Sequence, residues 1–135
     1  MERAQVKLTF VGDVMCEADQ IIAHKVSDND YNFNLVFNSF EDYFASSDYV
    51  VANLETPIAG EECGYSKEKW SFNSPIQFAE ALKRSGVDLV STANNHCLDR
   101  GIKGLKNTIK ALDKCNLKHI GTYADKKQKN VLLKI

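Results

Sequence analysis

Four polar side chains crowd one short segment of this sequence, residues 94–99, and their types are suited to chemistry. They are two amides, an imidazole and a carboxylate: Asn94, Asn95, His96 and Asp99. The segment follows an apolar run at 87–90, typical of a buried strand, and precedes a periodic segment at 102–115, typical of a helix. In parallel α/β sheets such a turn lies at the carboxyl end of the strand, where ligands bind. We therefore expect a functional site at this turn.

Polar residues follow the other predicted strands in the same way. They come after strands expected at 6–11, 49–52 and 117–120, and they are Asp13, Asn53, Glu55, Thr122 and Asp125. Oxygen and imidazole ligands from several strand ends suit a hard or borderline divalent cation. Such an ion could polarise a phosphoryl or carbonyl oxygen and activate water, and His96 could protonate a leaving group.

Each of these residues also has an ordinary structural interpretation. Asp13 follows a glycine and suits an Asx turn or a helix cap, and Glu55 suits a solvated loop. Asn94 and Asn95 suit a left-handed turn, which asparagine tolerates. Asp99 is better suited to capping the next helix than to binding a ligand, and the histidine can be satisfied within the turn. Their arrival at one sheet edge is the stronger indication of function.

Strands and helices alternate along most of the chain. Strands are predicted at 6–11, 49–52, 88–91, 117–120 and 131–135, and helices at 35–44, 75–85 and 102–115. Ser74 as a cap and Pro75 mark one helix start, and Gly86 marks its left-handed end. This order predicts a single α/β domain over residues 1–135, with a mostly parallel sheet and right-handed βαβ crossovers.

A long loop at 59–73 carries two aromatic residues, Trp70 and Phe72. Long loops in compact domains are often functional, so these rings either cover a site or pin the loop onto the core.

The remaining cysteines and histidines are expected to be structural. The four cysteines form no Cys-x-x-Cys pair, which favours a reducing compartment over a disulfide framework. Cys16 and Cys97 lie near two of the proposed site turns, where packing as small apolar groups is commoner than zinc ligation. His24 and His119 are assigned no role in the site.

Composition limits the partners. The net charge of −1 argues against a nucleic-acid backbone or an anionic membrane as the main partner. No apolar run is long enough for a membrane span, and residues 1–5 do not resemble a signal peptide. These features predict a soluble, cytoplasmic chain if Met1 is the true start.

Three ordered motifs resemble those of the capsule-synthesis protein CapA family, which is linked to poly-γ-glutamate capsules. They are Phe10–Met15, Val51–Pro57, and Ser91–His96 with Asp99 and Gly101. The segment 72–89 and Gly121 match in the same order. The resemblance covers nearly the whole chain and corresponds to the N-terminal half of the family's domain, so a missing C-terminal half would complete it.

The resemblance implies a fold like half of a calcineurin-like metallophosphoesterase sandwich. It implies that Asp13, Glu55 and Asn95 bind a divalent metal ion (Mg²⁺, Mn²⁺ or Zn²⁺) and that His96 lies beside the reacting group. Met15 stands where the metallophosphoesterase pattern has a histidine, and the family's later histidines would lie beyond residue 135. Asn53, Asn94 and Asp99 are expected to contact substrate.

Two functions follow from this interpretation. The first is a metal-dependent hydrolase-like domain acting on a phosphoester or a γ-glutamyl amide, with His96 as general acid. The alternative is a non-catalytic module that binds an acidic polymer or another capsule-synthesis subunit through Lys67, Lys69, Arg100 and Lys103. Members of the family are often membrane-associated.

Overall fold

The computed structural model describes residues 4–65 and 69–130. Its strands are β1 (Leu8–Val14), β2 (Lys25–Ser27), β3 (Asp30–Tyr31), β4 (Tyr49–Leu54), β5 (Leu89–Ser91) and β6 (Lys118–Ile120). Its α-helices are α1 (Ala18–Ala23), α2 (Asn34–Ala45), α3 (Ile76–Arg84) and α4 (Gly101–Lys114). Two short 3-10 helices are η1 (Glu61–Cys63) and η2 (Gln128–Asn130).

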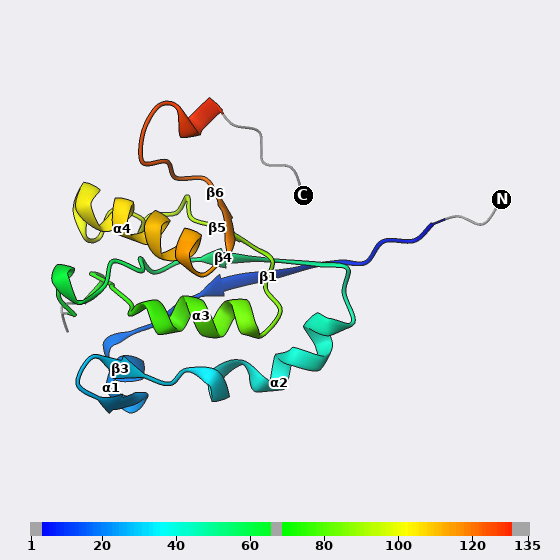
Figure 1. The fold of residues 1–135 in the computed structure, drawn as a ribbon, viewed down its shortest axis with the longest axis horizontal. Coiled ribbons are helices and arrows are strands. Elements are labelled where there is room, and N and C mark those ends of the chain that lie inside the picture. The colour runs from blue at the N-terminus through cyan, green and yellow to red at the C-terminus, as the bar shows by residue number, and fades with distance from the viewer. Residues whose placement is uncertain (1–3, 66–68, 131–135) are drawn as a thin grey trace.

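Four of the strands form one parallel sheet in the order β1-β4-β5-β6. The predicted α/β fold with a mostly parallel sheet is confirmed. The strands of the sheet point the same way, and Figure 1 shows the segment after β4 and the first turn of α4 at the end to which the β1 and β4 arrows point. The carboxyl ends of the strands therefore meet at one edge, as the sequence predicts.

The helices cover the sheet with their apolar faces. α3 buries Phe78 and Leu82, and α4 buries Ile109 and Leu112. Along β4 the burial alternates, with Val50, Ala52 and Leu54 buried, because successive side chains of a strand face opposite sides. The residues between them include Asn53, which lies on the other face of the sheet.

The start of α3 differs from the prediction. Pro75 is the N-cap residue, and no side chain caps the helix. The expected Ser74 cap is wrong, because the Ser74 hydroxyl pairs instead with that of Thr56 at 3.0 Å. The end of α3 is as predicted: Gly86 has a φ of 105°, which a glycine adopts at little cost.

The segment between β1 and α2 contains structure that the sequence pattern did not indicate. It forms the short helix α1 and an antiparallel pair of strands, β2 and β3. In α2, Phe37 and Phe44 are buried, whereas Phe40 and Tyr43 are about half exposed. The strand predicted at 131–135 lies outside the described residues.

The described part of the chain contains no helix long and apolar enough to cross a bilayer.

Candidate functional site

A bulge in β1 sets the direction of Asp13. Phe10 pairs with Val51, but Asp13 rather than Gly12 pairs with Asn53, so β1 has one residue more than β4 between the two pairs. Because side chains alternate between faces, the extra residue moves Asp13 onto the face that carries Asn53. Bulges of this kind are common beside active sites, where they redirect a side chain.

Two carboxylates converge on the amide nitrogen of Asn53. Asn53 Nδ2 donates to Asp13 Oδ1 at 2.8 Å and to Glu55 Oε2 at 2.6 Å. Glu55 is only 8% exposed, and its backbone N–H donates to Val14 O at 3.0 Å, which ties it to the end of β1. The sequence indicated that these residues share an edge, and the structure places their polar groups within hydrogen-bonding distance.

Asn94 joins the β4 edge to the turn that follows β5. Its Nδ2 donates to Leu54 O at 2.8 Å and makes a longer contact of 3.4 Å with Asn53 Oδ1. Its Oδ1 accepts from His96 N at 3.0 Å. Neither Asn94 nor Asn95 has a positive φ, so the left-handed-turn interpretation is wrong. Asn94 shapes the turn through its side chain instead.

His96 and Asp99 form a hydrogen-bonded pair. His96 Nδ1 lies 2.9 Å from Asp99 Oδ2, and the two side chains are 13% and 11% exposed. A carboxylate oxygen can only accept, so Nδ1 carries the proton and Nε2 is left for a ligand. Asp99 does not cap α4, whose N-cap residue is Arg100. That part of the sequence interpretation is wrong, because the carboxylate is used by the imidazole.

The loop before α3 packs directly on this pair. Phe72 N–H donates to Asp99 Oδ2 at 2.8 Å, and the Phe72 ring meets the His96 ring edge-on, with 4.7 Å between centroids. Arg100 Nη2 donates to Ser71 O at 2.9 Å. Phe72 therefore lies against the His96 turn, which agrees with the first of the two roles that the sequence left open for this ring, covering a site.

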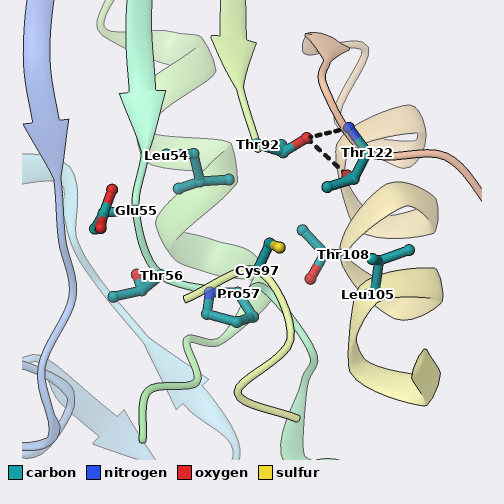
Figure 2. Close-up of a pocket in the computed structure, with 9 residues that line it drawn as sticks. All are labelled: Leu54, Glu55, Thr56, Pro57, Thr92, Cys97, Leu105, Thr108 and Thr122. Carbon is teal, nitrogen blue, oxygen red and sulfur yellow. Dashed lines mark hydrogen bonds between the residues drawn. The ribbon is translucent and has the colours of Figure 1, made fainter. Parts of the chain in front are cut away.

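Three other residues named from the sequence are placed differently. Asn95 is exposed and makes no hydrogen bond with any described residue. Thr122 pairs with Thr92, whose Oγ1 lies 2.7 Å from its hydroxyl (Figure 2). Asp125 Oδ1 accepts from two backbone N–H groups of its own turn, at 2.7 Å and 3.0 Å. Of these three residues, only Asn95 could bind a ligand without losing a hydrogen bond to another described residue.

The enclosed space behind the edge is too small for a substrate. A cavity of about 10 Å³ lies beside Glu55, Thr92, Cys97 and Thr122 (Figure 2), which is about the volume that a single water needs. A larger cavity of about 260 Å³ lies on the β1 side of the edge, lined by Gly12, Asp13, Met15 and Phe37.

Cys16 is structural, as the sequence suggested. It is 1% exposed, and burial raises the pKa of its thiol to about 12, so the thiol stays protonated at neutral pH. All four cysteines are free. His24 stacks on Phe33, and His119 Nε2 pairs with Asp113 at 3.1 Å.

The donor set at the edge suits one hard cation completed by water. Asp13 and Glu55 offer carboxylate oxygens that approach one point, and Mg²⁺ is commonly held by one or two carboxylates and several waters. Within residues 4–65 and 69–130 no group of three or more histidine, cysteine, aspartate or glutamate side chains could hold a metal ion. Asp13 and Glu55 are thus the two described carboxylates at this edge that could take part in binding a cation.

Comparison with known proteins agrees with the motifs at this edge. Residues 7–135 match the family described as bacterial capsule synthesis protein PGA_cap. The chain belongs to this family. It is 32% identical over 125 residues to a capsule biosynthesis protein CapA of Bacillus anthracis, a match that covers 89% of this chain and 29% of that protein.

A second relative matches a similar share of this chain. The chain is 28% identical over 127 residues to a PGA biosynthesis protein CapA of Bacillus subtilis (strain 168), covering 90% of this chain and 32% of the relative. The chain thus spans about a third of the length of the curated relatives that it matches.

Proposed function

We propose that this edge binds one divalent cation and hydrolyses a phosphoester or a γ-glutamyl amide during capsule synthesis. The observation that supports this proposal is the convergence of Asp13 and Glu55 on Asn53 Nδ2, since Asn53 Oδ1 lies 3.4 Å from Asn94 Nδ2 in the turn that carries His96. Carboxylates beside an oriented imidazole are the groups that metal-assisted hydrolysis requires.

Each residue has a defined part in this mechanism. Asp13 and Glu55 would hold the cation, which would supply Lewis-acid chemistry to the substrate oxygen and to the attacking water. Oxygen donors favour Mg²⁺ or Mn²⁺ over Zn²⁺ at this position. His96 in its doubly protonated form gives the Nε2 proton to the leaving group, while Asp99 accepts from Nδ1–H and keeps the ring in place. Asn53 and Asn94 fix the positions of the carboxylates and the turn.

Metal titration and turnover test the two halves of the proposal separately. Mn²⁺ is titrated into the chain by calorimetry, and binding is expected to weaken at least tenfold in Asp13→Asn and Glu55→Gln. Asp28→Asn is the matched control, because Asp28 is an exposed carboxylate in the β2–β3 hairpin. Equal binding by Asp13→Asn and Asp28→Asn would overturn the assignment of the cation site.

Turnover of 4-nitrophenyl phosphate tests the role of His96. General acid catalysis contributes roughly 10²- to 10⁴-fold, so His96→Ala is expected to lower kcat by about that factor without lowering Mn²⁺ affinity. Unchanged turnover in His96→Ala would show that the imidazole does not take part in the chemistry.

A second candidate function is a non-catalytic module that binds an acidic polymer or another capsule-synthesis subunit. The absence of a three-ligand cluster among the described residues favours it. A binding module keeps its ligand in the presence of a chelator, whereas the hydrolase proposal requires the cation. Titration with a glutamate oligomer in the presence and absence of EDTA separates the two.

A further inference from the structure

Trp70 is exposed and has an unfavourable backbone conformation. Its side chain is 66% exposed, and its φ is 66°. A positive φ is costly for a bulky aromatic residue, and such strain persists only where neighbouring contacts impose it. It is also the only tryptophan in the sequence.

The two residues that follow Trp70 are held by the candidate active site. Arg100 donates to Ser71 Oγ at 3.1 Å and to Ser71 O at 2.9 Å, and Asp99 accepts from Phe72 N. Because consecutive Cα atoms are about 3.8 Å apart, the backbone of Trp70 lies within about 8 Å of that of Phe72, whose ring touches His96. Trp70 is therefore held at the rim of the site by the turn that carries His96.

Lys69 adds a positive charge to this ring. Its ammonium lies 5.0 Å from the centroid of the Trp70 ring, and it makes no ion pair with the described residues. Of the other basic residues that the sequence suggested for binding carboxylates, Lys103 pairs with Glu62 at 3.1 Å, and Arg100 holds Ser71. Lys67 lies outside the described residues.

We infer that Lys69 and Trp70 form a recognition platform for a carboxylate-bearing polymer that enters the site across this loop. The inference rests on the proposed function of the edge and adds the residues that select its substrate. The flat face of tryptophan can cover the methylene groups of such a chain, and the ammonium can pair with a carboxylate beside them. An isolated phosphate group would use the lysine alone, so the pairing of ring and charge favours the polymer.

Fluorescence of the single tryptophan gives a direct assay. A γ-linked glutamate oligomer is titrated into the chain, and the Trp70 emission is expected to change saturably and in parallel with binding measured by calorimetry. Trp70→Ala is expected to raise the calorimetric Kd about tenfold, and Lys69→Met about threefold, the size of one exposed charge contact with its ring.

Lys118→Met is the matched control. Lys118 also places its ammonium over an aromatic ring, that of Tyr49 at 5.4 Å, but both residues begin their strands at the opposite edge of the sheet. An equal loss of affinity in Lys118→Met and Lys69→Met would show general attraction to basic residues and overturn the inference. Binding of the oligomer with no change in Trp70 emission would overturn it as well.

The outcome for the platform can be distinguished from that for the hydrolase. His96→Ala is expected to lose turnover of 4-nitrophenyl phosphate and to bind the oligomer normally. If turnover depends on His96 but the oligomer leaves Trp70 unaffected, the platform is refuted and the catalytic proposal stands. If the oligomer binds at Trp70 and His96→Ala has no effect on turnover, the catalytic proposal fails and the platform stands.

Discussion

Replacing Asp99 with asparagine tests whether this carboxylate orients the imidazole of His96, the proposed general acid. Asp99 Oδ2 accepts from His96 Nδ1 at 2.9 Å and from Phe72 N at 2.8 Å. Asparagine has nearly the same shape, but it lacks the charge, and one of its two terminal groups is a donor. The substitution therefore weakens the hold on the imidazole while keeping the packing.

The size of the effect follows from the kind of hydrogen bond that is lost. A hydrogen bond to a charged group contributes about 1.5–3 kcal/mol. If that energy keeps His96 in its working orientation, kcat of Asp99→Asn falls about 10- to 100-fold, whereas a rise in KM would indicate the substrate contact that the sequence interpretation assigns to Asp99. Mn²⁺ affinity is expected to be unchanged.

Nitrogen NMR of the histidine rings gives a readout that does not depend on activity. The sequence has three histidines, and neutral His96 is expected to carry its proton on Nδ1 in the native chain and to lose that preference in Asp99→Asn. Asp113→Asn is the control, because it removes the equivalent partner of His119 at a distance from the site. If Asp99→Asn leaves the His96 ring signals and kcat unchanged, Asp99 has no orienting role.

Two further predictions concern stability. Asn73 is 4% exposed and makes three hydrogen bonds to loop backbone groups at 2.7–2.9 Å. At about 1 kcal/mol for each bond, Asn73→Ala is expected to lower the free energy of unfolding by about 3 kcal/mol in urea denaturation. An unchanged urea midpoint would contradict this prediction. Burial raises the Cys16 thiol pKa from 9.0 to about 12, so the folded state holds this proton more tightly. The contribution of this thiol to the free energy of unfolding is fully present below pH 9.0 and is lost towards pH 12, by about 1.4 kcal/mol per pH unit. The free energy of unfolding of Cys16→Ala, measured over the same pH range, should lack this slope.

The positions of the main elements could be predicted from the sequence because their patterns are local. The apolar runs before Asp13, Asn53 and Asn94 mark strands, and the helical periodicity after residue 101 marks α4. Parallel pairing then brings the strand ends to one edge without knowledge of any side-chain contact. α1 and the β2–β3 pair were missed, because α1 has only six residues and the short β2 (KVS) and β3 (DY), unlike β4 and β5, lie in no apolar run.

The detailed geometry of the site depends on contacts that a pattern does not encode. The bulge before Asp13 shifts the side chain to the other face, and a one-residue change of register has no hydropathy signature. Asp99 was predicted to be a helix cap because it lies just before α4. Its carboxylate instead accepts from His96 and from the backbone N–H of Phe72, in a loop 27 residues away. Gly121 could be matched as a motif residue, but the need for glycine at this position follows from the structure. Its φ is 107°, and an added Cβ would lie 2.7 Å from Ala93 Cβ.

The edge is assembled by the protein's own hydrogen bonds, whatever ligand it takes. Asn53 donates to two carboxylates that would otherwise repel one another, so Asp13 and Glu55 are held together without a cation. Asn94 and Asp99 tie the turn after β5 to β4 and to the loop before α3. In the proposed function a cation would replace the hydrogen bonds from Asn53 to these carboxylates, so removing the cation with EDTA should lower turnover while leaving the fold intact.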